Sequence, residues 1–164
     1  MPRALRMRRL LAAVVALWLG GVASAWAEDR VALLMGNAAY HGAPLPNGLN
    51  DVEAMAAVLR DLGFKVRSKT NLTRKEMLTE MASFAAQVKT MSGGVALFYF
   101  SGHGIRYGER NYIVPIGAEW GQPDLVPEEA IAAERLVELM GRQRGVVKLV
   151  VLDAATAADG AKTG

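Results

Sequence analysis

Three apolar runs stand out in the pattern of hydrophobic and polar positions along the chain. They cover residues 31–35, 95–100 and 146–152, and the second is apolar, β-branched or aromatic at every position. Runs that lack the alternation of a half-exposed strand are typical of strands buried on both faces of a parallel sheet. The pattern therefore predicts that these three segments are neighbouring central strands.

The segment after the first run is expected to contain a helix and a further strand. Asn50 and Asp51 have side chains that can accept hydrogen bonds from the free N–H groups of a first helical turn. Over residues 52–62 the apolar positions recur at i, i+3, i+4 and i+7, and Gly63 is a typical C-terminal stop. The alternating segment 64–67 then predicts a second strand, nearer an edge of the sheet.

Two more helices are predicted farther along the chain. Thr73 and Glu76 have the spacing of a capping box, and an apolar stripe follows over residues 77–88. Another helix is predicted over residues 128–140, with acidic side chains in its first turn. Because strands alternate with helices, we expect right-handed crossovers and a mainly parallel sheet. The whole pattern predicts an α/β fold, a three-layer αβα sandwich.

Residues that can carry chemistry follow the two longest apolar runs. The run 95–100 leads into a Ser-Gly-His-Gly segment, 101–104, and we predict that the strand stops there and that the glycines present His103 at its carboxyl end. Asp153 follows the run 146–152 in the same way. In open α/β sheets, ligands and catalytic groups gather at this end of the strands. His103 and Asp153 are therefore candidate site residues.

The chain has 164 residues, enough for one domain with a hydrophobic core. Residues 1–27 contain four arginines, a short apolar run and an Ala-Trp-Ala sequence. This combination is typical of a secretory signal peptide, here cleaved after Ala27. The alternative is an uncleaved N-terminal membrane anchor, although the apolar run is shorter than the roughly 20 residues that a span needs.

The charge balance changes once this leader is set aside. Residues 1–27 hold four of the 19 basic side chains and none of the 16 acidic ones, so the remainder carries a net charge of −1. The remainder lacks the basic face of a nucleic-acid-binding protein. With two histidines, no cysteine and no phosphate-binding glycine motif, it gives no support for a metal or cofactor. Without cysteine there are no disulfides, so stability must rest on the core.

Short motifs in the chain resemble those of bacterial caspase-like peptidases, the metacaspase or orthocaspase branch of the caspase fold. They extend over nearly all of the predicted mature chain, and the histidine motif together with the Leu-Asp-Ala sequence is specific. The resemblance implies a caspase-like large-subunit (p20) domain over residues 28–155, followed by a tail, 156–164, that we expect to be frayed. The motifs are Gly36–Tyr40, Leu49–Asp51, Leu62–Phe64, Tyr99–Gly104, Asn111–Pro115 and Leu152–Ala154.

The resemblance also implies a mechanism. In this family a cysteine thiolate attacks the peptide carbonyl, and a histidine protonates the leaving amine. His103 matches the family histidine, and the cysteine is expected about 50 residues later, where this chain has Ala155. Alanine has no nucleophile, and the chain contains no other cysteine. Ser101 and Thr156 carry hydroxyls nearby, but a hydroxyl attacks only when a base is positioned beside it.

Three residues match the family's pocket for a basic substrate side chain. Asp51 and Asp153 match its two acids and Ser101 matches its serine, so the resemblance implies that they bind Arg or Lys. Asp51 has a second interpretation as a helix cap, and Asp153 as an acid that holds the end of a strand. His41 lies in a proline-rich loop and is expected to be solvated.

The sequence therefore predicts an exported caspase-like domain, periplasmic or secreted, that is catalytically inactive and binds peptide segments containing Arg or Lys. One alternative is a cysteine endopeptidase with basic specificity in an altered or truncated form. Another is a plain α/β peptide-binding module. Because four main strands leave an open sheet edge, a second chain or a homologue that completes the sheet is an expected partner.

Overall fold

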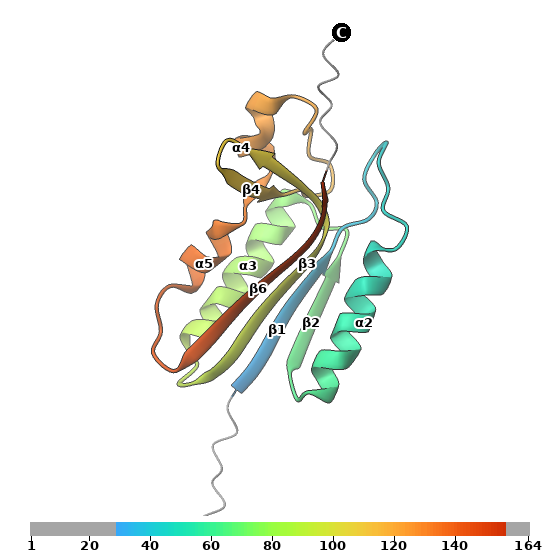
Figure 1. Cartoon of the computed structure of the whole chain (residues 1–164). Helices are drawn as coiled ribbons and strands as arrows, with labels where there is room; N and C mark the ends of the chain where they lie inside the picture. Colours follow the sequence, from blue (N-terminus) through green and yellow to red (C-terminus); the bar gives the residue numbers. More distant parts are fainter. Residues whose placement is uncertain (1–28, 157–164) are drawn as a thin grey trace, which may run out of the picture.

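A mixed sheet of six strands forms the centre of the structure, a computed structural model that describes residues 29–156 (Figure 1). The strands are β1 (Asp29–Gly36), β2 (Lys65–Thr70), β3 (Gly94–Tyr107), β4 (Arg110–Ile113), β5 (Ile131–Ala132) and β6 (Val146–Thr156). Four are parallel, in the order β2–β1–β3–β6, and β4 and β5 add to the far end of β3 in antiparallel fashion. The mainly parallel sheet and the neighbouring positions of the three apolar runs are confirmed.

Helices cover both faces of the sheet and give the predicted αβα layers (Figure 1). One face carries α2 (Gly48–Asp61), and the other carries α3 (Arg74–Lys89) and α5 (Glu134–Met140). A 3-10 turn, η1 (Pro123–Leu125), and a short helix, α4 (Val126–Glu129), precede β5. The α2 face of the core contains Ala32, Leu34, Val52, Ala56, Leu59, Leu97 and Tyr99. The opposite face contains, among others, Leu33, Met35, Met77, Met81, Phe84, Phe98, Phe100 and Leu136.

The predicted start of α3 is confirmed, whereas the helix cap predicted for α2 is wrong. α2 begins ahead of Asp51, and the residue before it, Asn47, makes no side-chain hydrogen bond to the helix. Asp51 lies inside the first turn, so its interpretation as a helix cap is wrong. Leu62 follows the helix and is exposed, not part of the buried stripe. At α3 the Thr73 N–H donates to Glu76 Oε2 at 2.8 Å, which confirms the capping box.

β3 does not stop at the histidine segment, as the sequence predicted. It continues into a hairpin with β4, because its pairing changes from β1 and β6 to β4 near Gly104. Glycine is needed at position 102 because the neighbouring side chains pack closely, and not because the chain turns there. An added Cβ would lie 2.5 Å from the Phe100 ring and 2.6 Å from the Tyr40 hydroxyl. His103 therefore lies within a continuous strand.

The helix predicted over residues 128–140 is broken. After α4, Ala130 has an extended backbone with ψ of 175°, and β5 follows before α5 begins. Ile131 is the register partner of Ile113 in the β4–β5 pair, and both are buried in the core. Strand pairing of Ile131 therefore overrides the helical pattern of its segment.

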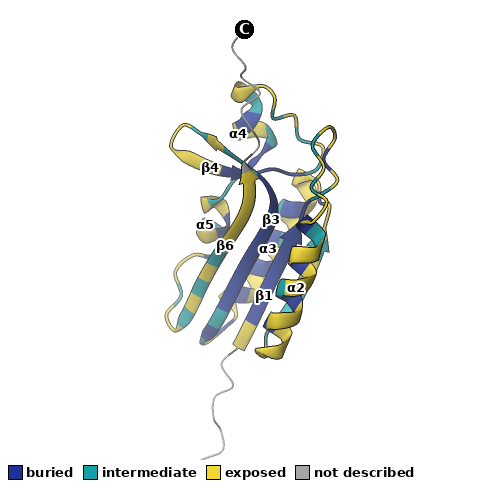
Figure 2. Ribbon diagram, turned by 45° about the vertical axis from the view of Figure 1, so that its right-hand side comes forward, coloured by how far each residue is buried: buried dark blue, intermediate teal, exposed yellow. Residues whose placement is uncertain are grey.

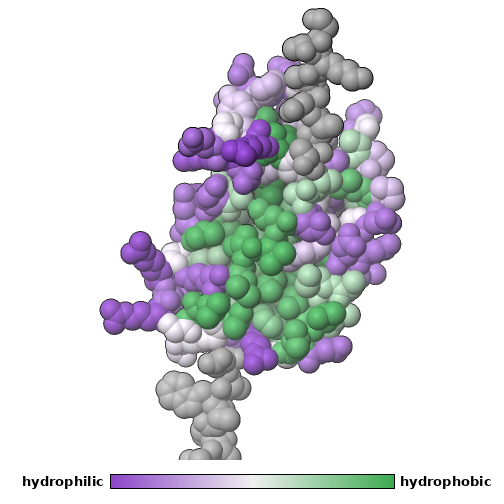
Figure 3. Space-filling view, in the orientation of Figure 1, coloured by the Kyte–Doolittle hydropathy of each residue, from purple (hydrophilic) through white to green (hydrophobic). Residues whose placement is uncertain are grey.

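β6 is an edge strand, although its apolar sequence predicted a central one. Among the described residues it pairs only with β3. α2 packs mainly over β1, β2 and β3, so β6 alternates between exposed and partly buried residues over positions 146–151 (Figure 2). The exposed large apolar residues of β6 that share the α2 face are register partners of β3 residues on that face. They are Val147, Leu149 and Val151. Figure 3 shows a continuous hydrophobic area on this side of the molecule.

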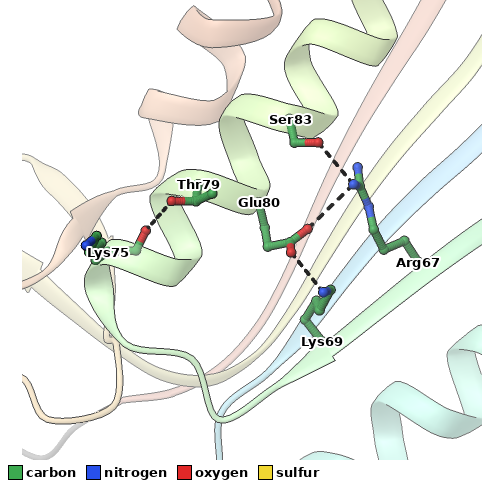
Figure 4. Close-up of polar contacts among 6 residues, drawn as sticks. All are labelled: Arg67, Lys69, Lys75, Thr79, Glu80 and Ser83. Carbon is green, nitrogen blue, oxygen red and sulfur yellow. Dashed lines mark hydrogen bonds and ion pairs between the residues drawn. The ribbon is translucent and has the colours of Figure 1, made fainter.

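β2 closes the opposite edge of the sheet with charged side chains. Glu80 of α3 lies 2.9 Å from Lys69 Nζ and 3.6 Å from Arg67 Nη1, and Arg67 also donates to Ser83 Oγ at 3.1 Å (Figure 4). The strand has only six residues. Short, charged edge strands resist pairing with other chains, so β2 is suited to face solvent in a way that β6 is not.

Candidate functional site

His103 and Ala155 lie next to each other near the carboxyl ends of β3 and β6. They are Cα partners in the parallel register, and Ser101 and Asp153 are partners two residues earlier. Because side chains alternate along a strand, all four residues point to the same face of the sheet. The fold thus brings together the histidine and the alanine that the sequence assigned to a dyad position.

His103 is buried, with 7% of its surface exposed, and is held by Tyr40. The His103 N–H donates to the Tyr40 hydroxyl at 3.1 Å, and that hydroxyl donates to the Val114 carbonyl at 2.8 Å. The two rings also pack at a centroid distance of 4.5 Å. Burial raises the pKa of Tyr40 to about 12, against the opposing effect of the hydrogen bond from His103. The hydroxyl therefore keeps its proton at neutral pH and makes both bonds.

The two nitrogens of the His103 ring have different surroundings. Nε2 lies 2.8 Å from the Ala43 carbonyl oxygen, and because a carbonyl only accepts, Nε2 carries the proton in the neutral ring. Nδ1 is buried and has no hydrogen-bond partner within residues 29–156. The neutral ring therefore has its lone pair at Nδ1, where a general base accepts a proton.

Asn37 anchors the loop that follows β1 and is completely buried. Its side-chain oxygen accepts from the Leu72 N–H at 2.8 Å, and its amide donates to the Leu72 and Val114 carbonyls, each at 3.2 Å. The Val114 carbonyl thus accepts from both Asn37 and Tyr40. This network fixes the chain just ahead of Tyr40 and Ala43, the two residues that bind His103.

A cavity of about 210 Å³ lies beside Ala155 and contains the three residues that the sequence assigned to a substrate pocket. Asp51 of α2, Ser101 of β3 and Asp153 of β6 all line it, together with loop residues 45–47 and Gly48 at the start of α2. Its volume is below the roughly 300–1,000 Å³ of pockets for whole small molecules. The cavity therefore suits a single side chain.

The side chains of this cavity favour a positively charged guest. Asp51 and Asp153 are exposed and Ser101 is buried, and no Lys or Arg of the described chain is among the lining residues. The Tyr99 hydroxyl donates to Asp153 Oδ2 at 3.0 Å. Burial raises the pKa of Tyr99, and the hydrogen bond to Asp153 and the negative charge of Asp153 raise it further, to about 12. Tyr99 therefore remains a donor that orients the Asp153 carboxylate.

Within residues 29–156 no three His, Asp or Glu side chains lie close enough together to hold a metal ion. No helix of that part is long and apolar enough to cross a membrane. The predicted leader lies outside the described residues, as do most of the predicted tail and the side chain of Thr156.

The residues that position the site were not predicted from the sequence. Tyr40 and Tyr99 both fall within motifs that resemble the family, so their positions in those motifs were a usable signal. Ala43 acts through its carbonyl group, which every residue has, so no side-chain pattern reveals its role. His41 is exposed.

Sequence comparisons identify relatives of this chain. The model of the caspase domain family matches residues 29–163. The mucosa-associated lymphoid tissue lymphoma translocation protein 1 homolog of Mus musculus is 31% identical over 128 residues, which are 77% of this chain and 15% of that protein. Caspase-1 of Felis catus is 36% identical over 82 residues, which are 49% of this chain and 20% of that protein. The chain thus spans only 15% to 20% of the length of these two relatives.

Proposed function

This chain belongs to the caspase-domain family of cysteine peptidases, and from that premise we propose that it binds peptides without cleaving them. The proposed ligand is a peptide segment with Arg or Lys, whose side chain enters the cavity lined by Asp51 and Asp153. One observation carries the proposal: both carboxylates and Ser101 line a single cavity, and the nucleophile position beside it is Ala155.

The lack of cleavage follows from the groups around His103. A methyl group at Ala155 cannot attack a carbonyl, and the chain contains no cysteine. Within the described residues, Nε2 of His103 contacts the Ala43 carbonyl and Nδ1 has no partner, so no hydrogen bond links the ring to the Ser101 hydroxyl. A serine nucleophile needs that link to its base.

Binding of a cation follows from the two carboxylates. Two negative charges that converge on one cavity repel each other, and a guanidinium or ammonium group relieves that repulsion. A well-formed hydrogen bond to a charged group contributes roughly 1.5–3 kcal/mol. Because Asp51 and Asp153 are exposed, solvent screening reduces this gain. We expect dissociation constants between about 1 µM and 1 mM.

Calorimetric titration with an Arg-containing peptide and its citrulline analogue tests the proposal, because citrulline keeps the shape of arginine without its charge. We expect the Arg peptide to bind about 5- to 10-fold more tightly and Asp153→Asn to remove that difference. Asp61→Asn is the matched control, since Asp61 is exposed at the other end of α2. Equal affinities for the two peptides in the unchanged chain would mean that the carboxylates are structural.

Mass spectrometry of the same peptides after incubation tests for cleavage. We expect none from the unchanged chain, and slow turnover from Ala155→Cys that disappears in the double variant with His103→Ala. The reason is that Ala155→Cys places a thiol at the strand position paired with His103, whose Nδ1 has no partner within residues 29–156. Turnover by the unchanged chain that is lost in His103→Ala would reveal another nucleophile and contradict the proposal.

Export is part of the proposed function, and its support is the signal-peptide pattern of residues 1–27. Mass spectrometry of the protein from a periplasmic or culture fraction is expected to give a chain that begins at Glu28. An intact N-terminus found in the membrane fraction would favour the anchored alternative.

A second copy of the chain is the proposed partner of the free edge of β6. The support is the length of this strand, 11 residues, and its exposed apolar side chains. Antiparallel pairing of two β6 strands about Leu149 sets Val147 opposite Val151 of the second copy. The exposed side chains then cover one another across the pair.

A further inference from the structure

The described chain has a second and larger cavity, of about 590 Å³, with walls that contact His103. It is lined by residues 41–43 and 117–122 and shares no residue with the acidic cavity. His103 contacts two of its walls: the Ala43 carbonyl at Nε2, and the Trp120 ring at a centroid distance of 5.6 Å. Trp120 also packs edge-on against Tyr40 at 5.4 Å. His103 thus contacts the walls of the larger cavity, while its chain neighbour Gly102 and its register partner Ala155 line the acidic one.

The position of His103 indicates which part of a peptide reaches this cavity. In the chemistry of the family the histidine protonates the leaving amine, so the chain beyond the scissile bond must pass close to the imidazole. A basic side chain in the acidic cavity therefore directs the residues that follow it toward His103 and Trp120. The loop after β1 borders both cavities along this path, since residues 41–43 line one and Leu45 and Pro46 line the other.

The lining of the second cavity indicates the chemistry of its guest. Glu119 is exposed, Trp120 is half-buried, and no Lys or Arg of the described residues lines the cavity. A cavity lined by both a carboxylate and an aromatic ring suits an ammonium or guanidinium group, through ion pairing and cation–π attraction. The volume lies within the range of pockets that hold whole ligands, so it has room for a long side chain.

We propose that this cavity is a second peptide subsite, which holds a Lys or Arg side chain from the residues that follow the basic residue bound in the acidic cavity. The chain would then recognise dibasic segments, with one cation at Asp51 and Asp153 and the next at Glu119 and Trp120. The proposal rests on the proposed function for the direction of the peptide, and its chemistry comes from the separate lining of the second cavity.

Four peptides separate the two subsites. They carry arginine or citrulline at the first position, each combined with lysine or alanine at the following position. We expect lysine to bind about 2- to 5-fold more tightly than alanine in both the arginine and the citrulline series. Asp153→Asn is expected to remove the preference for arginine over citrulline and to leave the preference for lysine over alanine.

Two variants test the second cavity directly. Glu119→Gln is expected to remove the preference for lysine, whereas Glu109→Gln, an exposed acid in the β3–β4 turn, is the matched control and keeps it. Gly121→Leu is expected to reduce the same preference by filling space, and an added Cβ at Gly121 meets no atom within 4 Å. The fold therefore tolerates this variant.

Trp120 also provides an optical readout that does not depend on affinity. In the chain that begins at Glu28 it is the single tryptophan, and its emission is expected to shift when lysine peptides bind. Equal affinities for the lysine and alanine peptides, with unchanged Trp120 emission, would overturn the second subsite even if arginine is still preferred over citrulline. A lysine preference without an arginine preference would overturn the proposed function and keep the second subsite.

Discussion

The two strands that carry the site differ in how far the described chain buries them. β3 lies in the centre of the sheet, and its site residues Ser101 and His103 are buried. β6 lies at the edge, and its site residues Asp153 and Ala155 are exposed. The histidine half of the site is therefore held in place by its own surroundings. The half formed by Asp153 and Ala155 depends on what covers β6.

Two leucines, one on each strand, show the same difference in burial, and the same substitution can be made at both. Leu97 of β3 and Leu149 of β6 are register partners and point to the same face. Leu97 is 8% exposed because α2 covers it, whereas Leu149 is 43% exposed. The chemical group is identical at both positions, so any difference between them measures burial.

The largest expected effect is that of Leu97→Ala. It is expected to lower the free energy of unfolding by about 2–5 kcal/mol, because it leaves a cavity under α2. Leu149→Ala removes the same atoms from a side chain that water already reaches, so we expect a cost of about 1 kcal/mol or less. Urea denaturation at low protein concentration measures both. Equal costs would mean that Leu149 is buried in solution, as in a stable dimer through β6.

High pH probes the buried half of the site through Tyr40. Its pKa is about 12 in the fold against an ordinary value of 10.0, so the unfolded chain loses this proton first. The contribution of the neutral Tyr40 phenol to the free energy of unfolding is complete below pH 10. It is lost as the pH rises through 12, which lowers the free energy of unfolding by about 2–3 kcal/mol. Urea midpoints are therefore expected to fall over this range, and less steeply in Tyr40→Phe.

Tyr99→Phe is the matched control for this pH dependence. The pKa of Tyr99 is also raised to about 12, but its partner Asp153 is exposed on β6. Solvent screening reduces the effect of an exposed charge, so we expect Tyr99→Phe to change the slope less than Tyr40→Phe. A slope that is unaffected by Tyr40→Phe would contradict the burial of its hydroxyl.

The smallest effect on stability is expected from Leu149→Lys, which nevertheless tests what covers β6. A charge on an exposed side chain changes the free energy of unfolding by about 0.5 kcal/mol or less. In analytical ultracentrifugation we expect the unchanged chain to self-associate and Leu149→Lys to stay monomeric. Val58→Lys, on the exposed side of α2, is the control. A monomeric unchanged chain would contradict the second copy as partner.

Local patterns predicted the elements whose contacts lie within a few residues. The Thr73–Glu76 capping box and the buried stripe of α3 are examples, because the hydrogen bond and the apolar spacing both belong to one helix. The helix predicted over residues 128–140 failed because Ile131 pairs with β4, a partner that is absent from its own segment. The strand end predicted at His103 failed for the same reason, since β4 extends β3 beyond it.

For the site, the sequence by itself determined which groups are present: an imidazole at His103, no thiol anywhere, and acids at Asp51 and Asp153. These are covalent facts that need no fold. The tertiary structure decided which of them meet, because the parallel register of β3 and β6 sets His103 beside Ala155 and α2 brings Asp51 to the cavity with Asp153. It also placed β6 at an edge of the sheet formed by residues 29–156. An apolar strand has the same sequence whether or not a neighbour covers it, and exposure depends on where that neighbour packs.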